Sequence, residues 1–122
     1  MGTEGYHKIS SLHPKRFVVS SNIKLLAEKA EAYWLIDAIA SHQGAIWRHQ
    51  KITEGARQWW ELTVYEDQSA RLVCMADDEV TELVNQEIPY TDYPLTREKI
   101  WVMPASTRQD GPLALCMLPA EY

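Results

Sequence analysis

The sequence predicts an α+β fold, with one long N-terminal helix packed on an antiparallel sheet of about five to six strands. An apolar run with helical spacing comes early in the chain, and short β-branched and aromatic runs follow it with few residues between them. Strands that follow a single helix are typical of an α+β layer, in which the helix covers one face of the sheet. The length of 122 residues suits a single domain, residues 1–122, with residues 1–14 expected to be loosely ordered.

The first strand and the helix are predicted between residues 15 and 43. The β-branched run Lys15–Ser20 indicates a strand. Ser21 or Asn22 can cap the helix that follows, because a side-chain oxygen at that position accepts a backbone N–H. We expect this helix to run to about Gln43, where Gly44 is a suitable C-terminal stop.

The remaining strands are predicted from alternation and from turn residues. Two runs separated by very few residues predict an antiparallel hairpin around Asp67-Gln68. Pro89 cannot donate to a strand ladder, which indicates an edge strand or a bulge in its run. The last two strands flank the turn signal Asp110-Gly111-Pro112. The predicted runs are Trp59–Asp67, Ser69–Asp78, Leu83–Tyr93, Glu98–Pro104 and Pro112–Pro119.

Strand alternation divides the predicted sheet into two faces. The helix is expected to cover the face that carries Trp60, Leu62, Val64, Ile100 and Val102. The second face would then carry Trp59, Tyr65, Trp101 and Met103, a large exposed patch for a monomer. Loops could fold over this patch, two sheets could pair back to back in a homodimer, or the aromatic side chains could line a ligand cleft. The acidic balance makes single-stranded nucleic acid the least favoured occupant.

Asp37 is the one carboxylate on the apolar stripe of the predicted helix. The residues one to four turns before it on the same face are all apolar or aromatic: Trp34, Tyr33, Ala30, Leu26 and Ile23. A buried carboxylate without a partner costs several kcal/mol, so Asp37 is expected to be partnered, protonated or facing a polar cavity. The candidate partners include an indole N–H, a Tyr hydroxyl, Ser41, Arg57 and Arg71. Three roles remain open for Asp37: a structural tie, an acid or base with a raised pKa at a pocket, or an interface contact. Asp92, within "YTDYPL", is read either as a turn residue or as a site residue.

The composition and the motifs favour a protein without catalytic or cofactor machinery. The net charge is −5, and the four histidines are scattered. Phosphate-binding glycine loops, HExxH and GxSxG are all missing from the sequence, so no cofactor and no metal is predicted. Cys74 and Cys116 lie in apolar runs without CxxC spacing, which indicates buried thiols and a reduced, cytoplasmic location. No apolar run is long enough for a signal peptide or a membrane span.

The runs "LAEKAEAYWLIDAIASHQ", "WWELTVYED", "NQEIPYTDYPL" and "LALCMLPAEY" resemble a family of small bacterial proteins that carries a domain of unknown function. The resemblance extends from about Phe17 to Tyr122. Members occur in cyanobacteria and on phages, plasmids and other mobile elements. The resemblance implies a small cytoplasmic product of an accessory gene, and it implies no catalytic residue.

The sequence therefore favours a non-enzymatic binding or interaction module, encoded on a mobile element and homo-oligomeric. A host protein or an element-encoded protein is a further expected partner, since an acidic surface suits a basic one. The alternative is a small-molecule-binding or hydrolytic protein with a pocket around Asp37 and Asp92. The candidate binding residues are Trp34, Asp37, Trp59, Tyr65, Asp92 and Trp101.

Overall fold

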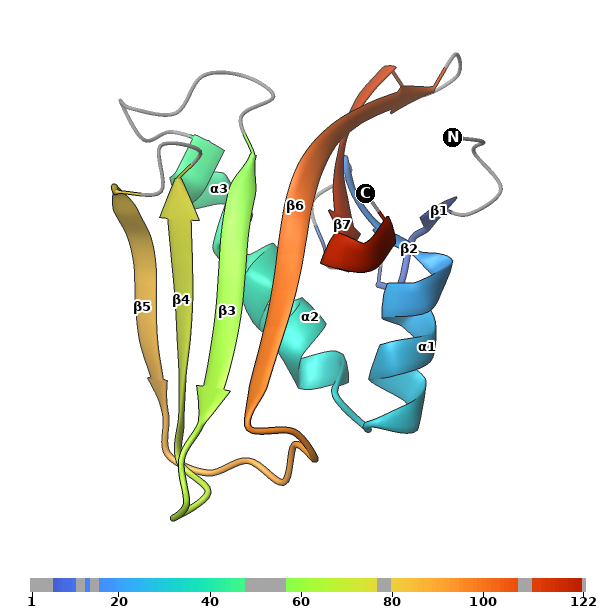
Figure 1. The fold of residues 1–122 in the computed structure, drawn as a ribbon. Coiled ribbons are helices and arrows are strands. Elements are labelled where there is room, and N and C mark those ends of the chain that lie inside the picture. The colour runs from blue at the N-terminus through green and yellow to red at the C-terminus, as the bar shows by residue number, and fades with distance from the viewer. Residues whose placement is uncertain are drawn as a thin grey trace.

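The computed structural model describes residues 6–10, 13, 16–47, 57–76, 80–107 and 111–121. A seven-stranded sheet dominates the fold, with the strand order β1-β2-β7-β6-β3-β4-β5, and α2 and α3 lie behind its strands in Figure 1. The elements are β1 (Tyr6–His7), β2 (Phe17–Ser20), α1 (Ser21–Lys29), α2 (Tyr33–Ser41), α3 (Gln43–Trp47), β3 (Gln58–Val64), β4 (Ala70–Ala76), β5 (Glu82–Ile88), β6 (Arg97–Thr107), β7 (Gly111–Met117) and the 3-10 helix η2 (Pro119–Glu121).

The sheet is mixed, so the predicted antiparallel sheet of five to six strands is wrong. The strands β3 to β7 form only antiparallel pairs with one another, but β2 pairs with β7 in parallel, with Val18 opposite Leu115. In the chain, the helices and the strands β3 to β6 all lie between β2 and β7. In the sheet, β7 is nevertheless the neighbour of β2 and runs in the same direction. The sequence predicted the strands from β2 onward but not β1, which lies within residues 1–14, and alternation does not reveal which distant strand each one joins.

The single long N-terminal helix is also wrong, because the chain leaves the helical path between α1 and α2. Glu31 has a positive φ of 51°, and the Ala32 N–H donates to the Ala27 carbonyl at 2.9 Å. This bond spans the end of α1 in the manner of a Schellman motif, and the apolar contact typical of that motif is supplied by Ala27 and Ala32, both buried. Glycine usually occupies the left-handed position, and glutamate there gives the sequence no visible stop signal.

The predicted boundaries around the helices shift in a similar way. Ser20, one residue before the predicted caps, is the N-cap of α1, and its hydroxyl accepts the Ile23 N–H at 3.2 Å. Gly44 lies inside α3 and does not stop the helix. None of the helices in the described part of the chain is both long enough and apolar enough to span a membrane.

The hairpin and the edge strand are confirmed. The strands β3 and β4 pair antiparallel through a turn in which Gln68 has a positive φ of 67°. The strand β5 ends at Ile88, just before Pro89, and lies at one edge of the sheet. The predicted turn around Asp110 lies partly outside the described residues, while Gly111 and Pro112 begin β7.

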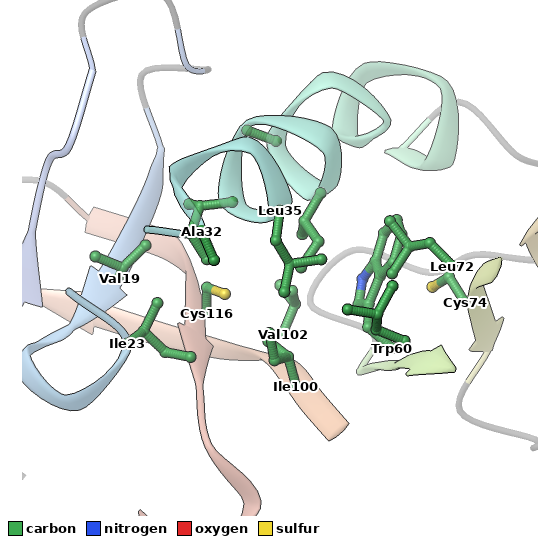
Figure 2. Packing of buried hydrophobic residues seen from close by; sticks show 14 of the residues in the cluster. Val19, Ile23, Ala32, Leu35, Trp60, Leu72, Cys74, Ile100, Val102 and Cys116 are labelled. Atoms are coloured by element: carbon green, nitrogen blue, oxygen red, sulfur yellow. The ribbon is translucent and has the colours of Figure 1, made fainter. Parts of the chain in front are cut away.

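The main core lies between the sheet and α2, as Figure 2 shows. The helix contributes Leu35, Ile36, Ile39 and Ala40, which recur with helical spacing and are all buried. Alternate residues of the central strands face them, so the predicted division of these strands into two faces is confirmed. The strand residues of this core include Trp60, Leu62, Leu72, Cys74, Ile100 and Val102. We call this side of the sheet the covered face and the opposite side the open face.

Candidate interaction surface

The open face carries a row of four large side chains that crosses four neighbouring strands. The strand registers place Trp59 of β3 opposite Met75 of β4 and Trp101 of β6, and Trp101 opposite Met117 of β7. Directly opposite residues lie about 4.5–5.5 Å apart at Cβ, close enough for their side chains to pack together. We call these four residues the Met–Trp–Trp–Met row.

The two tryptophans of the row are in contact, but the indole N–H of Trp59 makes no hydrogen bond to the described part of the chain. Their ring centroids are 4.7 Å apart with an interplanar angle of 73°, an edge-to-face arrangement. Trp59 Nε1 is inaccessible to solvent and, among the described residues, has no hydrogen-bond partner. A buried donor left unpaired costs about 1–3 kcal/mol, so this part of the open face is not a fully satisfied core.

The covering of the row is uneven. Met117, Met103 and Leu115 are buried and form a second apolar cluster with partly buried neighbours, including both tryptophans. The helix η2 contacts β6, and in Figure 1 it lies in front of β7, on the side opposite to α2. Trp59, Trp101 and Met75 remain half-buried. The row is therefore closed at its β7 end and partly open over β3 and β4.

The open face also carries charged residues of both signs beside the row. Arg71 donates to Glu87 at 3.0 Å and to Asn85, and Arg97 lies 3.9 Å from Glu61. Lys99 of β6 lies opposite Glu61 of β3. Glu82 of β5 lies opposite Met75, so three cations and three carboxylates on this face leave it without net charge, in contrast with the net charge of −5 for the whole chain.

The structure separates the six predicted binding residues into three groups. Trp59 and Trp101 are in contact on the open face. Tyr65 follows β3 and Asp92 lies in the loop between β5 and β6, and both residues are exposed. The Thr91 N–H donates to the Gln68 carbonyl at 2.7 Å, which joins this loop to the β3–β4 turn. Trp34 and Asp37 lie on α2, where Trp34 packs against the main core.

Asp37 is exposed, contrary to its predicted place on the buried stripe. The side chain is 61% exposed, and its Oδ1 lies 2.7 Å from Nε2 of His13, which is 6% exposed. The break at Glu31 changes the helical phase, so the residues of α1 do not share a face with Asp37. A carboxylate can only accept, so His13 Nε2 donates this hydrogen bond. Asp37 has a hydrogen-bond partner, but the argument that it needs one rested on a burial that the structure does not show, and His13 is not among the expected candidates.

The second site carboxylate, Asp92, also departs from its expected role. The turn around it is closed by Thr91, whose hydroxyl accepts the Tyr93 N–H at 3.1 Å. Thr91 and Tyr93 are both buried, while Asp92 points outward. In this loop, the exposed Asp92 therefore stands between two buried residues. Asp37 lies elsewhere, on α2, where it is bound to His13.

A network of buried polar groups on the covered face was not predicted from the sequence. The amides of Gln43 and Gln58 exchange two hydrogen bonds of 2.9 Å, and Trp60 Nε1 donates to Gln58 Oε1 at 2.9 Å. His42 lies against the Trp60 ring and has its Nε2 2.9 Å from Gln86 Oε1. Gln43 follows the buried residues Ile36, Ile39 and Ala40 at helical spacing, and this spacing could have indicated that Gln43 is buried too.

The thiols and the possible metal ligands show no arrangement for catalysis in the described residues. Burial raises the pKa of the Cys74 thiol to about 12, so this thiol stays protonated at neutral pH. Neither Cys74 nor Cys116 forms a disulfide. Within the described residues, no group of three or more His, Cys, Asp or Glu side chains could hold a metal ion.

The chain belongs to a family of unknown function (DUF6876), whose family model matches residues 1–122. This agrees with the resemblance to a domain of unknown function, although the match carries no information on bacterial or phage association. No curated protein and no solved structure matches the chain.

Proposed function

We propose that this member of a family of unknown function is a non-enzymatic interaction module that forms a homodimer through its open sheet face. The Met–Trp–Trp–Met row is the observation that carries the proposal. Tryptophan and methionine are enriched at protein interfaces, where large rings are buried on association. Trp59 and Trp101, both half-buried, are the two large aromatic residues of this row.

A second copy of the chain suits the open face better than a strongly charged partner. Its charged residues are of both signs, and four of them already lie in ion pairs within the face. Two such faces can approach without the repulsion that the net charge of −5 would otherwise produce. A twofold axis would place the same surface on both partners, with the two sheets packed about 10 Å apart.

The mass in solution tests this proposal. Light scattering across about 1–100 μM protein should give a dimer, twice the chain mass of 14.1 kDa. The variants Trp101→Glu and Met75→Glu should shift the mass toward monomer, because each places a charge in the contact. The matched control Leu25→Glu changes an exposed apolar residue of α1 and should leave the dimer intact. A monomer at every concentration overturns the proposal, and so does a dimer that both row variants leave unchanged.

Encoding on a mobile element and binding to a host protein or an element-encoded protein remain parts of this proposal. They rest on the family resemblance and on the acidic composition. The enzymatic alternative has less support, because Asp37 is tied to His13 and the exposed Asp92 lies on a separate loop.

A further inference from the structure

The end of the sheet at the β3–β4 turn forms a second surface, distinct from the Met–Trp–Trp–Met row. We call it the hairpin end and define it as residues 65–71 and 87–95. Tyr65 lies six residues along the chain from Trp59, which corresponds to roughly 20 Å of extended strand. The open face and the hairpin end share Arg71 and Glu87, but the row and the tyrosines of the hairpin end can be substituted separately.

The hairpin end contains a hollow beside exposed aromatic side chains. The hollow has a volume of about 220 Å³, and its lining includes Tyr65, Ser69, Arg71, Glu87, Ile88 and Pro89. Tyr65 is 48% exposed, and Tyr90 in the adjoining loop is 64% exposed. Tyrosine and isoleucine surfaces beside a hollow can pack against the aliphatic part of a long side chain.

Hydrogen bonds and burial hold this surface in place. Asp67 accepts the Ser69 N–H at 3.0 Å and the Ser69 hydroxyl at 2.6 Å, which closes the turn and lowers the pKa of the Asp67 carboxyl. In the neighbouring loop, Tyr93 is buried and its hydroxyl donates to Glu98 at 2.6 Å. Burial, and then the nearby Glu98 carboxylate, raise the pKa of Tyr93, so the hydroxyl keeps its proton. A surface fixed before binding loses less conformational entropy when a partner docks.

The charges of the hairpin end select a cationic partner. Residues 65–71 and 87–95 contain four carboxylates and one guanidinium, a net charge of −3. The guanidinium of Arg71 is engaged by Glu87 and Asn85. Among the described residues, Glu66 and Asp92 take part in no ion pair, and both are exposed.

We infer that the hairpin end docks an arginine-bearing segment of a partner polypeptide. The guanidinium would lie against the face of Tyr65 or Tyr90, where the ring attracts a cation, with its stem in the hollow and the unpaired carboxylates around it. Electrostatic attraction from the surrounding carboxylates speeds the encounter with such a segment.

A labelled peptide provides the test. Fluorescence anisotropy should detect binding of a decapeptide of alternating glycine and arginine, and at least fivefold weaker binding of the same peptide with citrulline, which has nearly the shape of arginine but no charge. Tyr65→Ser and Asp92→Asn should each raise the dissociation constant at least threefold. The matched controls Tyr33→Ser and Glu31→Gln change an exposed tyrosine of α2 and an exposed acid at the α1–α2 junction, and they should leave it unchanged.

Three outcomes would overturn the inference. The first is no binding of the arginine peptide at millimolar concentration, and the second is equal binding of the citrulline peptide. The third is an equal loss of affinity in the control variants, which would mean attraction to the acidic chain as a whole. The same titration of Trp101→Glu separates the two proposals, because a monomeric variant should still bind the peptide.

Discussion

Trp59 and Trp60 are neighbours in the chain, yet their indole rings meet opposite conditions on the two faces of β3. The Trp60 ring is 1% exposed, and its N–H donates to Gln58 in a network that also satisfies Gln43. The Trp59 ring is half-buried against Trp101, and its N–H is buried without a partner in the described structure. The covered face is therefore complete as a core, whereas the open face has the apolar surface of a core without its polar partners.

The largest expected effect is a difference in the free energy of unfolding between phenylalanine variants of these two tryptophans. Trp60→Phe should lower the free energy of unfolding by about 2–4 kcal/mol, because it removes buried volume and takes the donor away from Gln58. Trp59→Phe should stay within about 1 kcal/mol of the natural protein, because removing the unpaired N–H offsets the lost ring area. Urea unfolding at one protein concentration measures both. Equal losses would mean that Trp59 N–H has a partner in solution.

The two faces also differ in how far the sequence could predict them. Alternation along β3 and β6 assigned Trp59 and Trp101 to one face and Trp60 and Ile100 to the other, as the structure has them. This prediction worked because the side-chain period of a strand is two, whatever the strand order. The partners of the row, Met75 and Met117, required the registers of β4 and β7, which depend on contacts distant in sequence.

The helical region shows where periodicity misleads. One apolar pattern runs across α1 and α2, but it continues in phase only if the backbone stays helical at residue 31. Glu31 takes a left-handed conformation that glycine normally marks, so the sequence contained no warning. That single backbone conformation overturned both the long helix and the buried position of Asp37, because Asp37 no longer continues the face that Ile23 and Leu26 begin in α1.

The next largest effect shows how much the stability of the covered face depends on the hydrogen bonds between Gln43 and Gln58. Gln43→Leu should lower the free energy of unfolding by about 1–3 kcal/mol, because the Gln58 side-chain N–H loses its acceptor inside the core. Gln86→Leu is a milder control, since Gln86 is only half-buried and interacts with His42 at the margin of the network. If Gln43→Leu is neutral, water reaches these amides, and the covered face is less complete than its burial indicates.

The smallest effect concerns Asp37, where an exposed carboxylate satisfies a buried imidazole. Asp37→Ala should lower the free energy of unfolding by about 1–2 kcal/mol, because the His13 N–H loses its acceptor and the other ring nitrogen has no partner among the described residues. Asp37→Asn should lose less than about 1 kcal/mol, because the amide oxygen can accept the same hydrogen bond. Denaturant unfolding near neutral pH compares the two variants.

An equal loss of stability in both variants would mean that the charge of Asp37, and not the hydrogen bond alone, holds His13. An ion pair would then join α2 to His13, which precedes β2 in the chain. Among the described residues, the unpaired group at this tie would then be a single imidazole nitrogen, whereas on the open face it is the indole N–H of Trp59, within a row where both tryptophans are only half-buried. That difference in incompletely buried apolar surface is why we assign association to the open face and a structural role to Asp37.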